Sequence, residues 1–202
     1  MVPKFRIGAS IDSLLLTDYW LGARSTLSGS RRRIYGKAVS QKPDAFAFRA
    51  TALATGLFGG GAVSDTDLIV RHSAWPVYSS LLPRTTAQDW LSSNLRGVVS
   101  RQRLRFAASI RGTASSATWL SCLACAAYDK EKFGIAHWRV VHQLPGVTFC
   151  PEHECALNEC CAGCGAAFGG AKLLSMPGWP CQSSGEIRTT TKGGVRTKTW
   201  TG

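Results

Sequence analysis

The sequence predicts a mainly α-helical fold that gives way, in its second half, to small elements held together by side-chain ligands. Two observations support this prediction. In the first hundred residues, apolar positions recur at helical spacing within short stretches that end at Gly or Ser. In the second half, all eight cysteines and three of the four histidines lie between positions 122 and 181.

The composition is that of a folded protein, and its positive charge suits an anionic partner. The chain has 202 residues, of which 45% are hydrophobic and 18% are charged, so wholesale disorder is excluded. Apolar runs stay well short of the roughly 20 residues of a membrane helix. Gly8, Ser10 and Asp12 interrupt any secretory signal, so we expect a cytoplasmic protein. The net charge of +12 favours an anionic partner.

The first predicted helix spans Asp12 to Leu27 and ends at Ser28-Gly29. We expect a basic loop at Ser30 to Arg33, closed by Gly36. Arg31, Arg32 and Arg33 in this loop are candidate phosphate contacts, as are Arg101, Arg103 and Arg105 further along the chain. The alternative for the loop is a solvated charged surface with no ligand.

Capping residues and glycines mark the helices that follow. Asp44 is the expected N-cap of a second helix, which Gly59–Gly61 stop. Ser64–Asp67 resembles a capping box and starts a short helix, and Thr86–Asp89 starts another that ends at Gly97. Short helices with tight connections predict a helix-turn-helix-like helical domain over residues 1–97.

Some aromatic and imidazole side chains have structural interpretations. We expect Trp75-Pro76 to form a turn with a buried aromatic ring, and His72 to be a structural histidine. Trp138 and His142 are four residues apart, which places them on one face of a predicted helix that packs beside the cysteines.

Two pairs of residues have the spacing of zinc knuckles. Cys122-Leu-Ala-Cys125 and Cys150-Pro-Glu-His153 are separated by 24 residues. A two-residue gap lets both side chains of a pair turn to one ion, and two pairs complete a tetrahedral Cys3His site. Such a site leaves no open position for water, so we predict a structural zinc. The alternative is a set of buried free thiols.

A second zinc set is predicted downstream. Cys161-Ala-Gly-Cys164 is followed by Cys181, and Ser184 stands where a fourth ligand would complete another knuckle. Cys155 and Cys160 are spare cysteines that could complete this second site. The alternative is a group of partly exposed thiols without metal.

The chain therefore divides into four predicted parts. The helical domain of residues 1–97 leads into a basic linker over residues 98–118. A zinc-finger or ribbon region with two knuckle sets follows over residues 119–185. Residues 186–202 are rich in Thr, Lys and Gly and are expected to be a disordered tail.

Enzymatic activity is not predicted. Cys150 and His153 could be drawn as a catalytic dyad, but thiolates bound to zinc are poor free nucleophiles. The sequence contains no G-x-S-x-G, H-E-x-x-H or G-x-x-x-x-G-K-[ST] motif.

One continuous string carries a family resemblance. It reads HQLPGV over residues 142–147 and CP-x-H over residues 150–153, with Trp138 four residues before the first His. This string resembles the TniQ/TnsD family, which selects target sites for bacterial transposons. Similar segments lie upstream, at Trp75-Pro76, at Leu81-Leu82-Pro83 and at Leu95-Arg96-Gly97. The resemblance covers about residues 10 to 185.

The resemblance implies ligands and a role. It implies zinc ligation by Cys122, Cys125, Cys150 and His153, and a second site with Cys161, Cys164 and Cys181. It also implies a non-catalytic adaptor that links target DNA or an RNA-guided effector complex to a transposon AAA+ ATPase regulator, and it leaves a homodimer open. The alternatives are a stand-alone zinc-containing DNA-binding regulator and, in a third class, a cysteine hydrolase. Leu123 and Ser184 depart from the family pattern.

Overall fold

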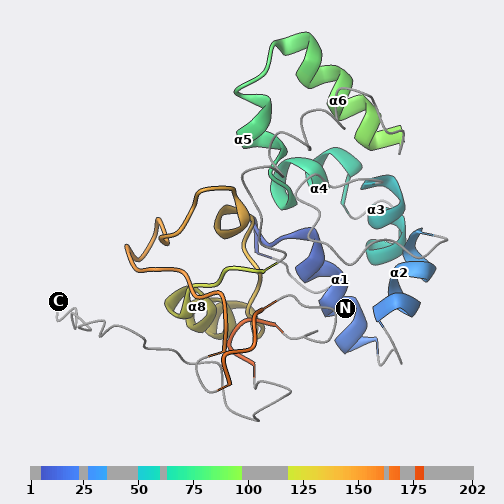
Figure 1. Ribbon diagram of the computed structural model, residues 1–202. Coiled ribbons are helices and arrows are strands. Elements are labelled where there is room, and N and C mark those ends of the chain that lie inside the picture. The colour runs from blue at the N-terminus through green and yellow to red at the C-terminus, as the bar shows by residue number, and fades with distance from the viewer. Residues whose placement is uncertain are drawn as a thin grey trace.

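The structure is a computed structural model that describes residues 6–22, 27–35, 50–59, 63–96, 118–161, 164–168 and 176–179. The mainly helical fold is confirmed. Figure 1 shows α2 to α6 gathered on one side of the molecule and α8 with the cysteine-rich loops on the other, with α1 between them. In chain order the elements are α1 (Ile11–Leu21), α2 (Leu27–Tyr35), α3 (Ala50–Phe58), α4 (Asp65–His72), α5 (Trp75–Ser79), α6 (Arg84–Arg96), α8 (Leu123–Phe133) and the 3-10 helix η1 (Val140–Gln143).

An apolar cluster joins α1, α2, α3 and α4. Its fully buried members include Leu14, Leu53, Leu68 and Ile69, and burial of such side chains contributes about 1.5–3 kcal/mol each. The close approach of α2 and α3 depends on Gly56, because a Cβ there would lie 3.0 Å from the side chain of Ile34. The helical half is therefore a packed unit in its own right.

Residues 30–33 form part of α2, so the predicted basic loop is wrong. The first predicted helix also ends early, at Leu21, where the Gly22 N–H donates to the carbonyl of Asp18. Arg33 explains why a charged segment is helical here. Its guanidinium donates to the carbonyl of Gly56 at 2.9 Å and to the carboxylate of Asp18 at 2.7 Å. These tertiary contacts hold α2 against α1 and α3.

The helices after residue 63 follow the predicted caps in part. Ser64 caps α4 as expected, since its hydroxyl accepts from the Asp67 N–H at 3.0 Å. Trp75-Pro76 is the first turn of α5 rather than a simple turn, because proline fits the start of a helix. α6 begins at Arg84, two residues before the predicted start. Asp44 and Gly97 lie outside the described residues.

A second apolar cluster connects α1 to the cysteine-rich half. Leu16 packs with Trp119, Trp138 and Phe168, and the rings of Trp119 and Trp138 meet edge to face at 4.8 Å. Trp138 is not helical, which corrects the predicted helix face that it shares with His142. Instead, Arg139 forms a β-bridge with Ala9, and η1 starts only at Val140. α1 thus packs against the helical half through one set of side chains and against the cysteine-rich half through another.

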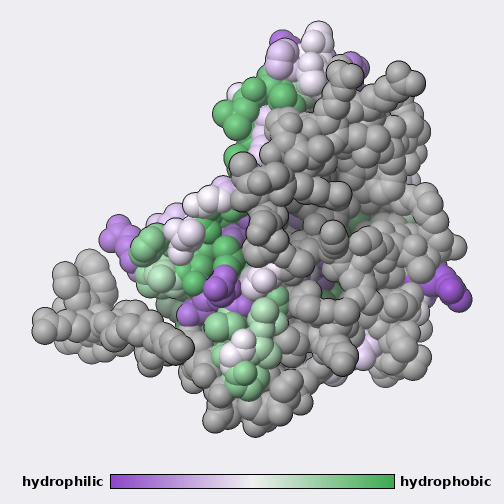
Figure 2. Space-filling view, in the orientation of Figure 1, coloured by the Kyte–Doolittle hydropathy of each residue, from purple (hydrophilic) through white to green (hydrophobic). Residues whose placement is uncertain are grey.

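The surface shows apolar areas in both halves. Figure 2 shows hydrophobic atoms over α5, where Val77 is 45% exposed, and Leu81 just after the helix is 73% exposed. In the cysteine-rich half, Phe149 is 62% exposed. Within the described ranges, no helix has the length and apolar character needed to cross a membrane. Apart from Thr118, the predicted linker lies outside the described residues, and so does the predicted tail.

Candidate metal centre

α8 positions the first pair of ligands. Cys122 is the N-cap of this helix, and its Sγ accepts a hydrogen bond from the Cys125 N–H at 3.5 Å. A capping side chain turns back over the first helical turn, so both sulfur atoms face the same side. The helix ends at Gly134, which adopts φ +78° and donates its N–H to the carbonyl of Lys130.

A tight turn positions the second pair. The Cys150 N–H donates to the carbonyl of Cys155, and the Glu154 N–H donates back to the carbonyl of Cys150, both at 2.8 Å. Glu154 takes a positive φ of +49°, which closes the turn. Bridges from Phe149 to Ala156 and from Ser121 to Asn158 connect the turn to the start of α8.

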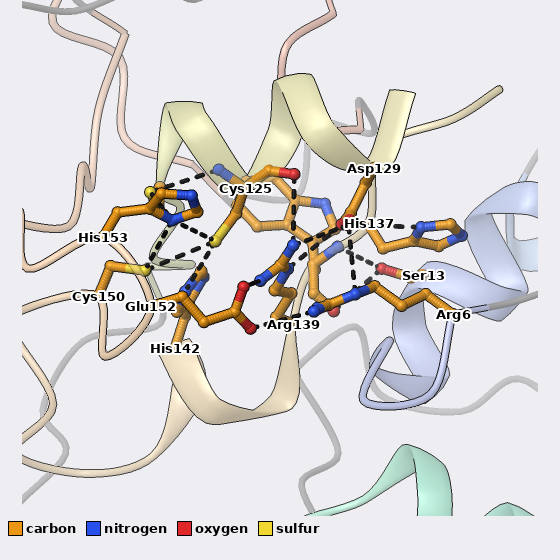
Figure 3. A network of polar contacts seen from close by, with 12 residues as sticks. Arg6, Ser13, Cys125, Asp129, His137, Arg139, His142, Cys150, Glu152 and His153 are labelled. Carbon is orange, nitrogen blue, oxygen red and sulfur yellow. Dashed lines mark hydrogen bonds and ion pairs between the residues drawn. The ribbon is translucent and has the colours of Figure 1, made fainter. Parts of the chain in front are cut away.

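The four predicted ligands converge on one point. Figure 3 shows three of them, Cys125, Cys150 and His153, turned toward one another. His153 Nδ1 lies 3.6 Å from Cys122 Sγ, 3.3 Å from Cys125 Sγ and 3.5 Å from Cys150 Sγ. The Cys125 and Cys150 sulfurs are 3.5 Å apart. Zinc bonds of ordinary length in a tetrahedron give edges of about 3.5–3.8 Å. The residues present therefore fit a tetrahedral metal ion, with three ligands buried and His153 exposed.

Within the cluster, ionisation of Cys122 is favoured over ionisation of Cys125. Hydrogen bonds from Cys125 act against burial and lower the pKa of Cys122 to about 4. The same interaction with Cys122, together with burial, raises the pKa of Cys125. Because the thiolate is the form that binds metals, Cys122 is ready to act as a ligand near neutral pH.

Two further residues line the cluster. His142 is buried with Nε2 3.8 Å from Cys125 Sγ, and burial lowers the pKa of its imidazole to about 4, so the ring is neutral. Cys155 Sγ lies 3.5 Å from Cys122 Sγ, so the structure places this spare cysteine against the first site. Burial, then the interaction with Cys122, raises the pKa of Cys155 to about 11.

A network of charges beside the cluster was not predicted from the sequence. The Arg139 side chain is 1% exposed and donates to Asp129 at 2.8 Å and to Glu152 at 2.6 Å. Arg6 pairs with the same two carboxylates, at 3.4 Å and 3.0 Å. Burial acts against the charged guanidinium, but the bonds to Asp129 and Glu152 raise the pKa of Arg139. The sequence signal that could have indicated this network is the position of Glu152 between the ligands Cys150 and His153.

The second cysteine set is described in part. The Cys161 N–H donates to the carbonyl of Ala166, and the Gly165 N–H donates to the carbonyl of Cys161, both at 2.8 Å. Gly165 adopts φ +69°. This turn has the same pair of hydrogen bonds as the turn that starts at Cys150. Cys161 is buried and Cys164 is exposed, while Cys181 lies outside the described residues.

The candidate phosphate contacts are described less fully. Arg32 is exposed, and Arg33 is engaged with Asp18 and Gly56 as described above. The side chain of Arg31 lies outside the described residues, as do Arg101, Arg103 and Arg105.

His72 is buried as expected, with Nδ1 2.9 Å from the carbonyl of Ala9. Because a carbonyl can only accept, Nδ1 carries the proton.

The fold and the site together define a mainly helical protein with a Cys3His cluster that could hold a metal ion. The TniQ family model matches residues 61–157, a range that contains all four ligands of the cluster. The chain therefore contains a TniQ domain, and TniQ is a transposition-associated family. No curated protein and no solved structure matches the chain.

Proposed function

We propose that this protein is a non-catalytic transposition adaptor in the cytoplasm. It connects a target, either DNA or an RNA-guided effector complex, to a transposon AAA+ ATPase regulator. The observation that carries this proposal is the TniQ match over residues 61–157, which includes the whole metal cluster. The exposed apolar side chains at α5 and at Phe149 support it as well, because such surfaces often mark protein contacts.

The bound ion in this proposal is zinc. Three thiols and one imidazole suit zinc, whereas calcium and magnesium prefer oxygen ligands. A site with four protein ligands is closed to water and substrate, so the ion supplies structural free energy rather than chemistry. Cys122, Cys125, Cys150 and His153 would hold the ion and thereby join α8 to the turn that follows Cys150.

A second zinc is proposed at Cys161, Cys164 and Cys181. The turn at Cys161 supports it, because its two backbone hydrogen bonds repeat those of the turn that carries Cys150 and His153. Each turn is also flanked by an antiparallel bridge, Phe149 to Ala156 in the first and Cys160 to Ala167 in the second. Cys164 corresponds in position to His153, since each follows the first ligand of its turn by three residues.

A co-purification experiment tests the adaptor role. The full chain is used to capture the AAA+ ATPase of the transposon, with and without target DNA or the effector complex. We expect the ATPase to be retained by the wild-type chain. Leu81→Ser changes an exposed apolar side chain, so it distinguishes the loss of an apolar contact with the ATPase from a loss of folding. Failure of the wild-type chain to retain the ATPase under every condition contradicts the adaptor role. Salt-sensitive binding to duplex DNA without any ATPase contact would instead favour a stand-alone regulator.

A further inference from the structure

The metal cluster and the charge network are built from the same two elements. Asp129 lies on α8, one helical turn after the ligand Cys125. Glu152 lies in the turn between the ligands Cys150 and His153. An ion bound to the four ligands would therefore also fix the distance between these two carboxylates, because each is attached to a segment that carries two ligands.

Two arginines bridge the carboxylates (Figure 3). Arg139 donates to both from the interior, with its side chain 1% exposed and the Asp129 side chain fully buried. Arg6 approaches from the N-terminal segment and is 20% exposed. A buried guanidinium needs a complete set of acceptors, because a buried charge that loses a partner destabilises the fold. Arg139 therefore depends on Asp129 and Glu152 being held together.

The backbone around Arg139 holds the N-terminal segment of residues 6–13. The Ser10 N–H donates to the carbonyl of Trp138 at 2.7 Å, and the Val140 N–H donates to the carbonyl of Gly8 at 2.8 Å. The hydroxyl of Ser13 adds a contact, since it accepts from the Trp138 N–H at 2.6 Å.

The same segment also contacts the helical half. The Gly8 N–H donates to the carbonyl of Arg71 at 2.8 Å, and His72 donates to the carbonyl of Ala9. Residues 6–13 thus lie between the end of α4 and the stretch around Arg139, and they connect the two halves. They also lie outside the range that the TniQ family model matches.

We propose that metal binding at the Cys3His cluster fastens residues 6–13 to the cysteine-rich half, so that the ion controls how firmly the two halves are joined. This inference rests on the metal site proposed above. When the ion leaves, the turn that carries Glu152 keeps its backbone bridge to the start of α8 but loses the link through the ligand side chains. Glu152, already 46% exposed, is then free to move into water. Arg139 and Arg6 then lose one of their two carboxylate partners, and the backbone pairing with Gly8 and Ser10 weakens.

Hydrogen exchange measured by mass spectrometry tests this connection on the full chain. The zinc-loaded protein and a chelator-treated sample are compared, and the zinc content of each is measured in parallel. We expect amides in residues 8–14 to exchange about tenfold faster after zinc removal, while amides in α4 keep their protection. Faster exchange confined to the ligand-bearing segments, with residues 8–14 unchanged, overturns the connection but leaves the metal site intact. A purified protein without bound metal refutes the metal site and the connection together.

A variant separates this effect from general unfolding. Each Glu152 oxygen accepts from one arginine, Oε1 from Arg6 and Oε2 from Arg139. Glu152→Gln presents an N–H2 group to one of the two arginines and removes the negative charge, without touching a ligand. We expect faster exchange in residues 8–14 with zinc still bound. Glu159→Gln is the control, since it makes the same change at another exposed side chain and should leave the exchange of residues 8–14 unchanged. Equal exchange in wild type and Glu152→Gln, with zinc bound in both, overturns the connection.

Discussion

The sulfur atoms of Cys155 and Cys122 are 3.5 Å apart, although Cys155 is not one of the four residues that converge on the metal centre. Cys155 belongs to the turn that carries Cys150 and His153, and its carbonyl accepts the Cys150 N–H. It therefore acts on the first site from outside, as a neighbour of the ligand Cys122.

Cys155→Ser tests this assignment. The serine hydroxyl can still donate to the Cys122 thiolate, and the backbone contact is unchanged, so we expect the first site to keep its metal ion. Its affinity should fall by less than about tenfold, since an outer contact is altered and no ligand is lost. Chelator competition on the variant and on Cys160→Ser measures this. Loss of one metal ion per chain in Cys155→Ser would show that Cys155 is a ligand.

Ser184→Cys tests the proposed second site. A neutral hydroxyl is a poor zinc donor compared with a thiolate, so the second site should release its metal before the first. The added cysteine should tighten the second site and leave the first unchanged. Metal release is followed against increasing chelator in wild type and in the variant. Simultaneous release of two zinc ions from both proteins would contradict a weaker second site.

Arg32 and Arg33 should differ in their effects on DNA binding. Arg32 is exposed, and if it contacts a phosphate, Arg32→Ala should lower the slope of log affinity against log salt by about 0.9 on duplex DNA. Titrations at several salt concentrations give this slope. The same slope in wild type and variant would show that Arg32 is only solvated.

Arg33→Ala should act on stability instead. Its guanidinium donates to Asp18 and to the carbonyl of Gly56, and both contacts are partly exposed. We expect the variant to lose about 1 kcal/mol of unfolding free energy because α2 is held less firmly against α1 and α3. Urea unfolding of the zinc-loaded protein measures the loss. An unchanged midpoint would contradict the role given to these contacts.

His72 should make the protein less stable in mild acid. Burial lowers the pKa of His72 below 6.5, although its bond to Ala9 acts in the opposite direction. The unfolded chain therefore binds a proton more readily than the folded chain, and stability falls as the pH drops through 6.5. His72→Gln should lose less stability than wild type between about pH 7 and pH 5. Parallel pH dependences in the two proteins would show that His72 does not contribute.

The two ligand pairs could be predicted from the sequence because the two residues of each pair are brought together by local structure. Cys122 and Cys125 are brought together by a single helical turn, and Cys150 and His153 by a single tight turn. The cap at Ser64 was predictable for the same reason, since its hydroxyl reaches an N–H three residues away. Patterns of this kind depend on neighbours in the chain and are visible in a single sequence.

The errors arose where distant residues decide the structure. α2 contains a run of arginines that is typical of a loop, and its helical form depends on contacts of Arg33 with Asp18 and Gly56. The spacing of Trp138 and His142 fits a helix, yet the backbone at position 139 pairs with Ala9, 130 residues away in the sequence. The network of Arg139 joins four segments and has no periodicity from which it could be predicted.

Zinc content of the purified full chain, measured together with its fold, tests the structural metal centre most directly. We predict at least one zinc ion per chain, and loss of the tightly held ion in Cys125→Ser together with loss of ordered structure around α8. Glu131→Gln changes an exposed side chain on the same helix and should keep both the ion and the fold. A wild-type chain that is free of metal and still fully folded would contradict the structural metal centre.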